Sequence, residues 1–287
     1  MSRKSGQYKR VASPIYWFGG KRYLVNKLLP LIPEHRTYVE VFGGAAWLLL
    51  SKPPSPVEVY NDIDSRLVNL FRVLRDPEKF AEFQRLAALT PYSREEWEWC
   101  YYHQDEGDDD VERAWRFFVV IRQSFAGKGG DWGYNVCDSS RRMSRVVSAY
   151  LSSIERLPEV HARFMRVQIE HDDFRNLIRR YDSPETFFYL DPPYVPSTRR
   201  GGGYLHEMSH EDHEDLVRLL LGIQGKALLS GYANPIYKAL EDAGWKRLNF
   251  EAVCHAAGRT RQSGLQGEGK VSATQKRVES VWFNYEP

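Results

Sequence analysis

Short apolar runs alternate along the chain with amphipathic stretches. The runs at 37–42, 57–60 and 186–190 have the length and the β-branched or aromatic content of strands buried in a parallel sheet. The stretches between them place an apolar residue at every third or fourth position, as expected of helices that cover a sheet. Strands that alternate with helices predict an α/β fold with helices on both faces of the sheet.

The alternation stops in the middle of the chain, where only helical periodicity is found. Its helical segments are predicted at 80–89, 94–102, 111–125 and 145–154. The loop between the last two is rich in glycine, aromatic and basic residues, and the strand pattern returns at 164–170. We therefore predict two parts, which are a sheet domain formed by residues 1–75 and 160–287 and a helical insertion formed by residues 76–159.

Composition narrows the class of protein. With 287 residues and 42% hydrophobic content, the chain suits one large or two modest domains. It has no apolar stretch long enough to span a membrane and no secretory signal segment, and its three scattered cysteines argue for reduced thiols and against a zinc site. These features predict a cytoplasmic protein. The net charge of +2 says little about partners.

Two strand ends carry the features of a cofactor site. The first strand runs into Gly43-Gly44, and an acidic residue, Asp62, ends the next strand about 20 residues later. That position suits a carboxylate that holds ribose hydroxyls, whereas Asp64 is expected to cap the following helix. The glycines do not form G-x-G-x-x-G, so a dinucleotide is disfavoured.

The sequence Asp191-Pro192-Pro193-Tyr194 follows the third apolar run. Two prolines make a stiff turn without N–H donors at the carboxyl end of a strand, where α/β sheets bind ligands. If Asp191 and the carbonyl of Pro192 accept the two N–H groups of an exocyclic amine, its lone pair becomes available, and Tyr194 can stack on the base. The alternative is a structural turn whose tyrosine packs on a neighbour.

Together these motifs resemble the Dam-type family of DNA adenine-N6 methyltransferases. They occur in the family's order over residues 14–75 and 160–287, and the end of the chain looks like its last strand. The four motifs are Trp17-Phe18-Gly19-Gly20-Lys21, Val39 to Ala45, Asn61 to Asp64, and Asp191 to Tyr194. The resemblance implies a Rossmann-like methyltransferase sheet that uses S-adenosylmethionine, needs no metal, and methylates a flipped adenine. It also implies that the helical insertion is a target-recognition domain.

The resemblance further assigns roles to the matching positions. Trp17 and Lys21 should contact S-adenosylmethionine, with Lys21 near its carboxylate, and Asp173 should contact the adenine of the cofactor. Catalysis should rest on Asp191, Pro192 and Tyr194. The complete cofactor site would comprise Trp17, Lys21, Phe42, Gly43, Gly44, Asp62, Asp173, Phe174 and Asp191.

The insertion departs from relatives that read GATC. Near residues 120–125 the family's first Asn and its Gly are missing, although Arg122 remains, which puts a GATC target in doubt. Arginine reads guanine edges and an aromatic ring can fill the space left by a flipped base, although each such residue could equally be surface or core. The candidates in the insertion are Arg122, Lys128, Trp132, Tyr134, Asn135, Arg141 and Arg142. Those expected to meet phosphates are Arg199, Arg200, Arg259 and Arg261.

Other functions share parts of this pattern. The same fold could methylate cytosine N4, or an amine or amide in RNA or protein, and a catalytically silent DNA-binding relative would keep the fold. We expect double-stranded DNA as the partner, a monomeric state, and an association with a cognate restriction endonuclease.

Overall fold

The computed structural model describes residues 8–17, 20–107, 109–139, 141–198, 205–253 and 276–287. Arg199, Arg200, Arg259, Arg261, Phe18 and Gly19 lie outside these ranges, as does the whole of 255–275, which the sequence predicts to be a flexible excursion.

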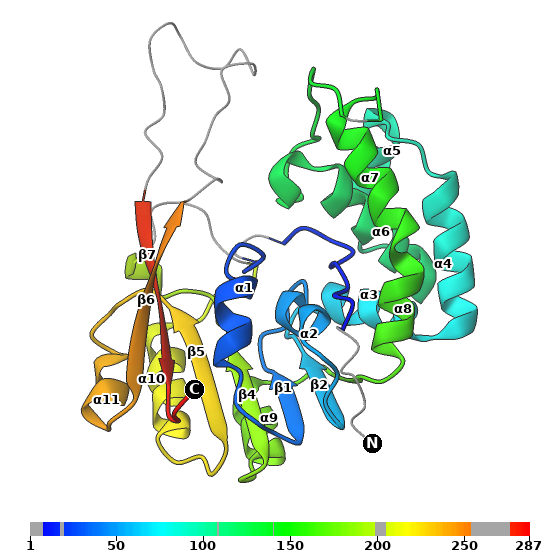
Figure 1. Cartoon of the computed structure of the whole chain (residues 1–287). Helices are drawn as coiled ribbons and strands as arrows, with labels where there is room; N and C mark the ends of the chain where they lie inside the picture. Colours follow the sequence, from blue (N-terminus) through cyan, green and yellow to red (C-terminus); the bar gives the residue numbers. More distant parts are fainter. Residues whose placement is uncertain (1–7, 18–19, 108, 140, 199–204, 254–275) are drawn as a thin grey trace, which may run out of the picture.

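A seven-stranded sheet forms the centre of the molecule, in the order β3-β2-β1-β4-β5-β7-β6 (Figure 1). Strands β1 to β5 pair in parallel, and β7 lies antiparallel between β5 and β6. The chain turns from β1 toward β2 on one side and later from β4 toward β5 on the other, so the order reverses between β1 and β4. The strands are β1 Thr37–Glu40, β2 Val57–Asn61, β3 Gln168–Glu170, β4 Thr186–Leu190, β5 Lys226–Gly231, β6 Lys246–Val253 and β7 Lys276–Phe283.

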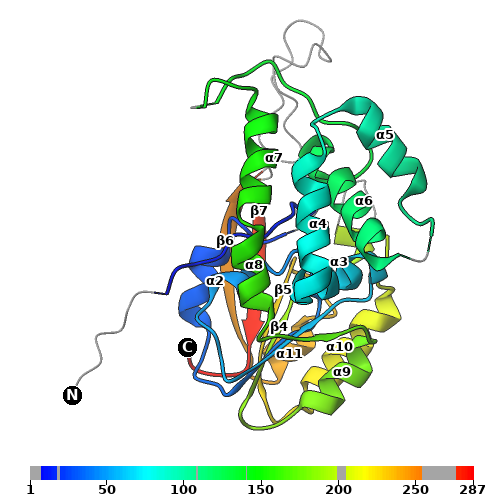
Figure 2. The same cartoon turned by 90° about the vertical axis from the view of Figure 1, so that its right-hand side faces the viewer.

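Helices cover both faces of this sheet, as predicted (Figure 2). One face packs against α9 Phe174–Tyr181, α10 His210–Leu220 and α11 Lys238–Asp242. The other packs against α1 Val25–Leu28, α2 Trp47–Ser51 and α3 Ser65–Arg75. Side chains alternate along the strands, so that Phe187 and Tyr189 face the second group while Phe188 and Leu190 face the first.

The helical insertion lies above one end of the sheet in Figure 1. It consists of α4 Pro77–Leu89, α5 Arg94–His103, α6 Asp110–Gln123, a 3₁₀ turn at Phe125–Gly127 and α7 Arg145–Glu155, and α8 Leu157–Phe164 leads from it back to the sheet. Two 3₁₀ turns at Leu29–Leu31 and Pro196–Thr198 lie in the sheet domain. Asp109 caps α6 by accepting hydrogen bonds from the amides of Val111 and Glu112, as the acidic run before this helix predicts.

Most of the insertion shares one core with the sheet. Phe83 of α4, Phe117 of α6 and Phe164 of α8 are buried in the same cluster as Tyr38 and Tyr60 of the sheet. A small separate cluster forms around Cys100, between α5 and α6. The insertion is therefore distinct along the sequence, but most of its helices pack as part of the sheet domain's core.

The predicted strand at 164–170 is wrong in its first half. Leu157, Val160 and Phe164 are fully buried on one side of α8. Their spacing of three and four residues is helical, and Pro158 occupies the first turn, where its missing N–H costs nothing. The strand β3 therefore begins only at Gln168.

In the described ranges, no helix is both long and apolar enough to cross a membrane.

Candidate active site

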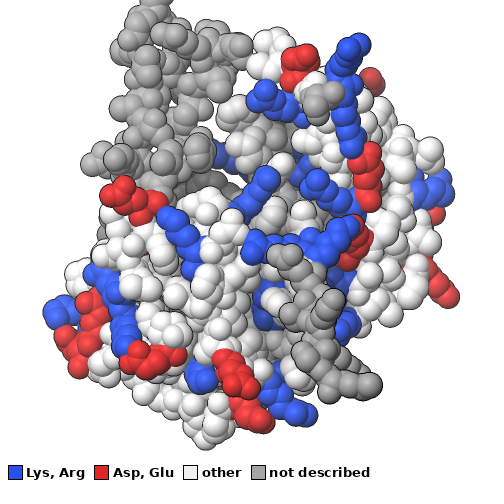
Figure 3. Space-filling model, viewed as in Figure 1, with Lys and Arg blue, Asp and Glu red and all other residues white. Residues whose placement is uncertain are grey.

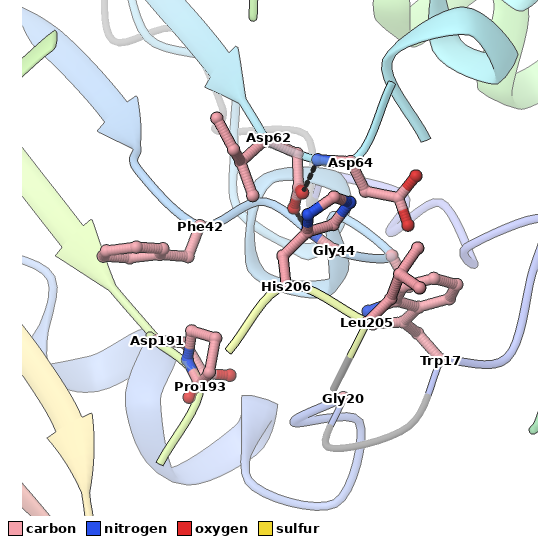
Figure 4. Close-up of a pocket in the computed structure, with 12 residues that line it drawn as sticks. Trp17, Gly20, Phe42, Gly44, Asp62, Asp64, Asp191, Pro193, Leu205 and His206 are labelled. Atoms are coloured by element: carbon pink, nitrogen blue, oxygen red, sulfur yellow. Dashed lines mark hydrogen bonds between the residues drawn. The ribbon is translucent and has the colours of Figure 1, made fainter. Parts of the chain in front are cut away.

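A pocket opens where three neighbouring parallel strands end, at the point where the strand order reverses (Figure 4). Gly44 follows β1, Asp62 follows β2 and Asp191 follows β4. Open α/β sheets bind ligands at this position. The lining residues are Trp17, Gly20, Phe42, Gly44, Ala45, Asp62, Ile63, Asp64, Asp191, Pro193, Leu205 and His206.

Asp62 holds the glycine turn in place. One carboxylate oxygen accepts the amide of Gly44 at 2.8 Å and the other accepts the amide of Asp64 at 2.8 Å. Burial raises the pKa of Asp62 to about 6, although these two hydrogen bonds act in the opposite direction. Asp64 caps α3 by accepting the amide of Arg66, as predicted.

The two glycines of the turn serve different purposes. Gly44 has φ of +49°, and a Cβ there would lie 3.0 Å from Cδ1 of Trp17. A Cβ on Gly43 would lie 2.2 Å from Cε2 of the buried Tyr60, whose hydroxyl is held by the carbonyl of Gly44. Gly43 therefore lets the turn approach β2 and does not line the pocket, and its cofactor contact stays a prediction.

We expect Gly43→Ala to lower the free energy of unfolding by about 1–3 kcal/mol, because Tyr60 has no room to move. Urea unfolding followed by circular dichroism measures this. Gly130→Ala is the matched control, since a Cβ there meets nothing within 4 Å. Equal unfolding midpoints for the two variants would contradict the close contact.

Asp191 lies at the bottom of the pocket beside a buried lysine. Nζ of Lys21 lies 3.0 Å from Oδ1 of Asp191 and 3.6 Å from Oε2 of Glu279 on β7. Burial raises the pKa of Asp191 to about 6; Lys21 opposes this rise and Glu279 adds to it. The carboxylate is thus ionised near neutral pH and is placed to accept hydrogen bonds.

Lys21 and Tyr194 both face the interior of the protein, and their contacts with the cofactor and the target base stay predictions. Lys21 is only 5% exposed, and its ammonium lies against Asp191, 4.4 Å from the centre of the Tyr194 ring, rather than along the pocket wall. Tyr194 is also 5% exposed, donates its hydroxyl to Glu279 and packs edge-on against Tyr232. The ring of Tyr194 packs beneath the Asp191–Tyr194 turn. A target base could stack on this ring only after the side chains that bury it had moved away.

Asp173 and Phe174 lie at the start of α9, and neither lines the pocket. Asp173 accepts the amide of Arg175 at 2.8 Å and forms an ion pair with its guanidinium at 3.1 Å. Phe174 is buried and packs against Phe42 at 5.8 Å between ring centres. Asp173 thus acts as a helix cap and Phe174 as a core residue, and their cofactor contacts stay predictions. Pro192 is also buried, and its neighbour Pro193 faces the pocket.

Three residues at or below the pocket were missed by sequence reasoning. Leu205 and His206 cross its open side from the segment before α10 (Figure 4). Glu279 lies beneath the Asp191 turn and is only 4% exposed. Glu279 alternates with the buried Val281 and Phe283 in the last strand, and a carboxylate in line with these two apolar residues is the signal that could have identified it.

The predicted DNA-contacting residues of the insertion include three exposed side chains and two whose side chains bind other residues of the insertion. Lys128, Tyr134 and Arg142 are exposed, and Tyr134 stacks against the half-buried Trp132. Arg141 forms a bidentate pair with Glu155, and the side-chain oxygen of Asn135 accepts the hydroxyl of Ser144.

Arg122 differs from the other predicted DNA-contacting residues because its side chain is buried. It is only 8% exposed at the end of α6, donates to the carbonyl of Ala149 at 2.5 Å and lies 4.4 Å from the centre of the Tyr16 ring. Its guanidinium therefore joins α6, α7 and the segment before Trp17 inside the protein, and it is not presented to DNA.

Lysine and arginine side chains gather over the hollow between the sheet and the helical insertion, on the face shown in Figure 3. Phosphates of a duplex would be attracted to such a surface. The pocket of Figure 4 lies at the carboxyl edge of the sheet.

The fold and the site define a class of protein. A doubly wound sheet with a glycine turn, an acidic second strand end and an acceptor-rich D-P-P-Y turn is the arrangement of an amine-methylating enzyme. A statistical model of the D12 class N6 adenine-specific DNA methyltransferases matches residues 17–252, and the chain belongs to this family.

Curated relatives agree with this assignment. The chain is 28% identical over 275 residues to the type II methyltransferase M1.LlaDCHI of Lactococcus lactis subsp. cremoris, covering 89% of this chain and 91% of that protein. It is 23% identical over 227 residues to the type II methyltransferase M.MjaIII of Methanocaldococcus jannaschii, covering 71% and 76%. It is 24% identical over 212 residues to the modification methylase StsI of Streptococcus sanguinis, where the match covers 68% of this chain but only 30% of that protein. The chain is thus an adenine-specific DNA methyltransferase, which uses a methyl donor and acts on DNA.

Proposed function

We propose that this enzyme transfers a methyl group from S-adenosylmethionine to the N6 amine of an adenine flipped out of double-stranded DNA. The observation that supports this most strongly is the convergence of Gly44, Asp62 and Asp191 on one pocket. Two aromatic residues, Trp17 and Phe42, form walls of the same pocket.

The pocket residues fit S-adenosylmethionine by their chemistry. Asp62 has acceptor oxygens for ribose hydroxyls, and Trp17 and Phe42 offer apolar surface to the cofactor's adenine and methionine chain. The short glycine turn leaves no G-x-G-x-x-G cradle for a pyrophosphate, which favours a cofactor without phosphates. When bound, S-adenosylmethionine supplies a methyl group activated by its sulfonium.

Asp191 and the carbonyl of Pro192 would accept the two N–H groups of the target amine. As the nitrogen forms its bond to carbon it becomes positively charged, and a carboxylate accepting its N–H stabilises that charge. The extra proton would then pass from the nitrogen to the carboxylate of Asp191, whose pKa of about 6 lets it release the proton to water. Flipping is needed because the amine of a paired base cannot be approached in line.

The exposed residues Lys128, Tyr134 and Arg142 of the 125–144 loop are proposed to meet DNA, with residues 76–159 acting as the target-recognition region. Asn135 and Arg141 would join them only after their partners Ser144 and Glu155 release them. The names of the relatives, type II methyltransferase and modification methylase, support a cognate restriction endonuclease as a partner. We also propose that the enzyme acts as a monomer in the cytoplasm.

Methyl-labelled S-adenosylmethionine and unmethylated genomic DNA test this function directly. After incubation the DNA is digested to nucleosides and the labelled species is identified. N6-methyladenine supports the proposal, while N4-methylcytosine would assign the site to another amine. Absence of label on DNA, with cofactor binding measured by calorimetry, would contradict it. Long-read sequencing of a methylation-free host that expresses the chain would identify the recognised sequence.

Methyl transfer should fall as the pH drops through about 6, because burial raises the pKa of both Asp62 and Asp191 to about 6. Below that value each further pH unit should lower the rate about tenfold per essential carboxylate. Initial rates of methyl transfer, measured between pH 5 and 8 at saturating cofactor, test the predicted fall in rate. A rate that does not change over this pH range would contradict the prediction.

The effect of these two carboxyl groups on folding stability has the opposite sign to their effect on the rate. A carboxyl whose pKa is raised by folding stabilises the protein at low pH, and this contribution is lost as the pH rises through about 6.

A further inference from the structure

Glu279 lies in a buried cluster with two residues that the proposed reaction requires. Its strand β7 lies antiparallel between β5 and β6, and alternation along β7 puts Glu279 on the same face as Val281 and Phe283. Leu24 and Leu28, at the chain segment that carries Lys21, belong to the same hydrophobic cluster as Val281 and Phe283. The fold therefore brings a carboxylate from the end of the chain beneath a turn formed after β4.

Each oxygen of Glu279 has a defined partner. Oε1 accepts the hydroxyl of Tyr23 at 2.5 Å, and Oε2 accepts the hydroxyl of Tyr194 at 2.5 Å. Oε2 also lies 3.6 Å from Nζ of Lys21, which lies 3.0 Å from Asp191. The side chains of Lys21 and Glu279 are both 5% exposed, so water screens these charges little.

We propose that Glu279 is a positioning residue that compensates the charge of Lys21 and holds Tyr194, so that Asp191 keeps its acceptor capacity for the substrate amine. This inference rests on the proposed function, in which Asp191 accepts the N–H groups of that amine.

The charges of the cluster show why a second carboxylate is needed. Lys21 and Asp191 alone would form a neutral pair, and the ammonium would compete with the substrate for the carboxylate. It would also repel the positive charge that develops on the amine nitrogen. With Glu279, two carboxylates face one ammonium, and the cluster keeps a negative charge for the transition state.

No other described acid close to Asp191 can take this role. Glu40 is fully buried, and burial raises its pKa to about 8, so it is mostly uncharged near neutral pH. The tyrosines stay neutral because burial raises their pKa values above the usual range. The titratable groups that face Asp191 are Lys21, Tyr23, Glu40, Tyr189, Tyr194, Tyr237 and Glu279.

Glu279→Gln isolates the charge from the contacts. A tyrosine hydroxyl can donate or accept, so the amide can keep hydrogen bonds to both Tyr23 and Tyr194 while losing the charge. We expect kcat to fall by about tenfold to a hundredfold, with little change in KM for DNA or cofactor. Because the anion of Glu279 raises the pKa of Asp191, the acidic limb of the pH–rate profile should move to lower pH, by about one unit.

Two further variants keep this test interpretable. Glu279→Asp retains the charge and should leave the acidic limb close to its wild-type position, even where kcat drops. Glu251→Gln makes the same chemical change on the exposed side of the neighbouring strand β6 and should leave the profile unchanged. Carboxyl ¹³C NMR measures the pKa of Asp191 directly, with its signal assigned by comparison with Asp191→Asn. This measurement does not need enzyme activity, so it can also be made on the folded fraction of a variant that folds poorly.

The inference is overturned if Glu279→Gln leaves both the acidic limb and the NMR titration of Asp191 at their wild-type positions and loses activity only in proportion to its folded fraction. Failure of the proposed function is a separate result, because the wild-type enzyme would then produce no N6-methyladenine.

Discussion

Asp191→Asn should lower the rate of methyl transfer by about a thousandfold or more while leaving DNA affinity nearly unchanged. The asparagine matches the carboxylate in shape but lacks the charge that stabilises the positive nitrogen in the transition state. It also removes the charge that lies 3.0 Å from Lys21, whose ammonium keeps its ion pair with Glu279. Initial rates with labelled S-adenosylmethionine give the first quantity, and fluorescence anisotropy with a labelled duplex gives the second.

Asp242→Asn provides the control for this change. Asp242 forms an exposed ion pair with Lys238 on α11, away from the pocket, and its substitution should alter neither quantity. If Asp191→Asn retained more than about a tenth of the wild-type rate, the carboxylate could not have the role proposed for it.

Glu58→Ala should lower the free energy of unfolding by about 3–5 kcal/mol, the second large effect that we expect. Glu58 is fully buried on β2 and binds two cations: Nζ of Lys52 lies 2.6 Å from Oε1, and Nη2 of Arg163 lies 2.7 Å from the same oxygen. Burial alone would raise the pKa of Glu58, but hydrogen bonds from Arg163 and Lys52 outweigh it and lower the pKa. Removing the carboxylate leaves two buried cations uncompensated.

Urea unfolding at pH 7 measures this effect, with Glu82→Ala as the control. Glu82 pairs with Arg85 on the exposed side of α4, where solvent screens the interaction, so no measurable change is expected. Because folding lowers the pKa of Glu58, its contribution to stability should disappear as the pH falls through that lowered value. A similar unfolding midpoint for both variants would show that the buried network contributes little.

The sheet could be predicted from the sequence because its strands are short, apolar and separated by clear turns. The run 186–190 becomes β4, and Gly44, Asp62 and Asp191 meet at one edge because parallel strands end there. The strand boundary at 164 was wrong because apolar residues such as Val160 and Phe164 occur both in buried strands and on the buried side of helices. Only the period set by Leu157, Val160 and Phe164 distinguishes helix from strand, and all three are buried in the sheet's core.

Side-chain direction was the harder part to predict. Arg122, Lys21 and Tyr194 have the residue types expected at a DNA or cofactor site, but all three are directed into the protein. Their partners are distant in sequence: Arg122 meets Ala149, and Tyr194 meets Glu279. A sequence motif does not include partners that are distant along the chain. The contact of Glu279 with Tyr194 depends on the pairing of β7 with β5, which the motif does not specify.

The shared core has a consequence for how new DNA specificities could arise in this enzyme. Phe83 and Phe117 of the insertion lie in one core cluster with Tyr38 and Tyr60 of the sheet, so exchanging residues 76–159 as a block between relatives would break interlocking contacts. The exposed 125–144 loop bears Lys128, Tyr134 and Arg142 but contributes nothing to that shared core. If this loop contacts DNA as proposed, we expect recombination confined to it to change the recognised sequence while the chain still folds.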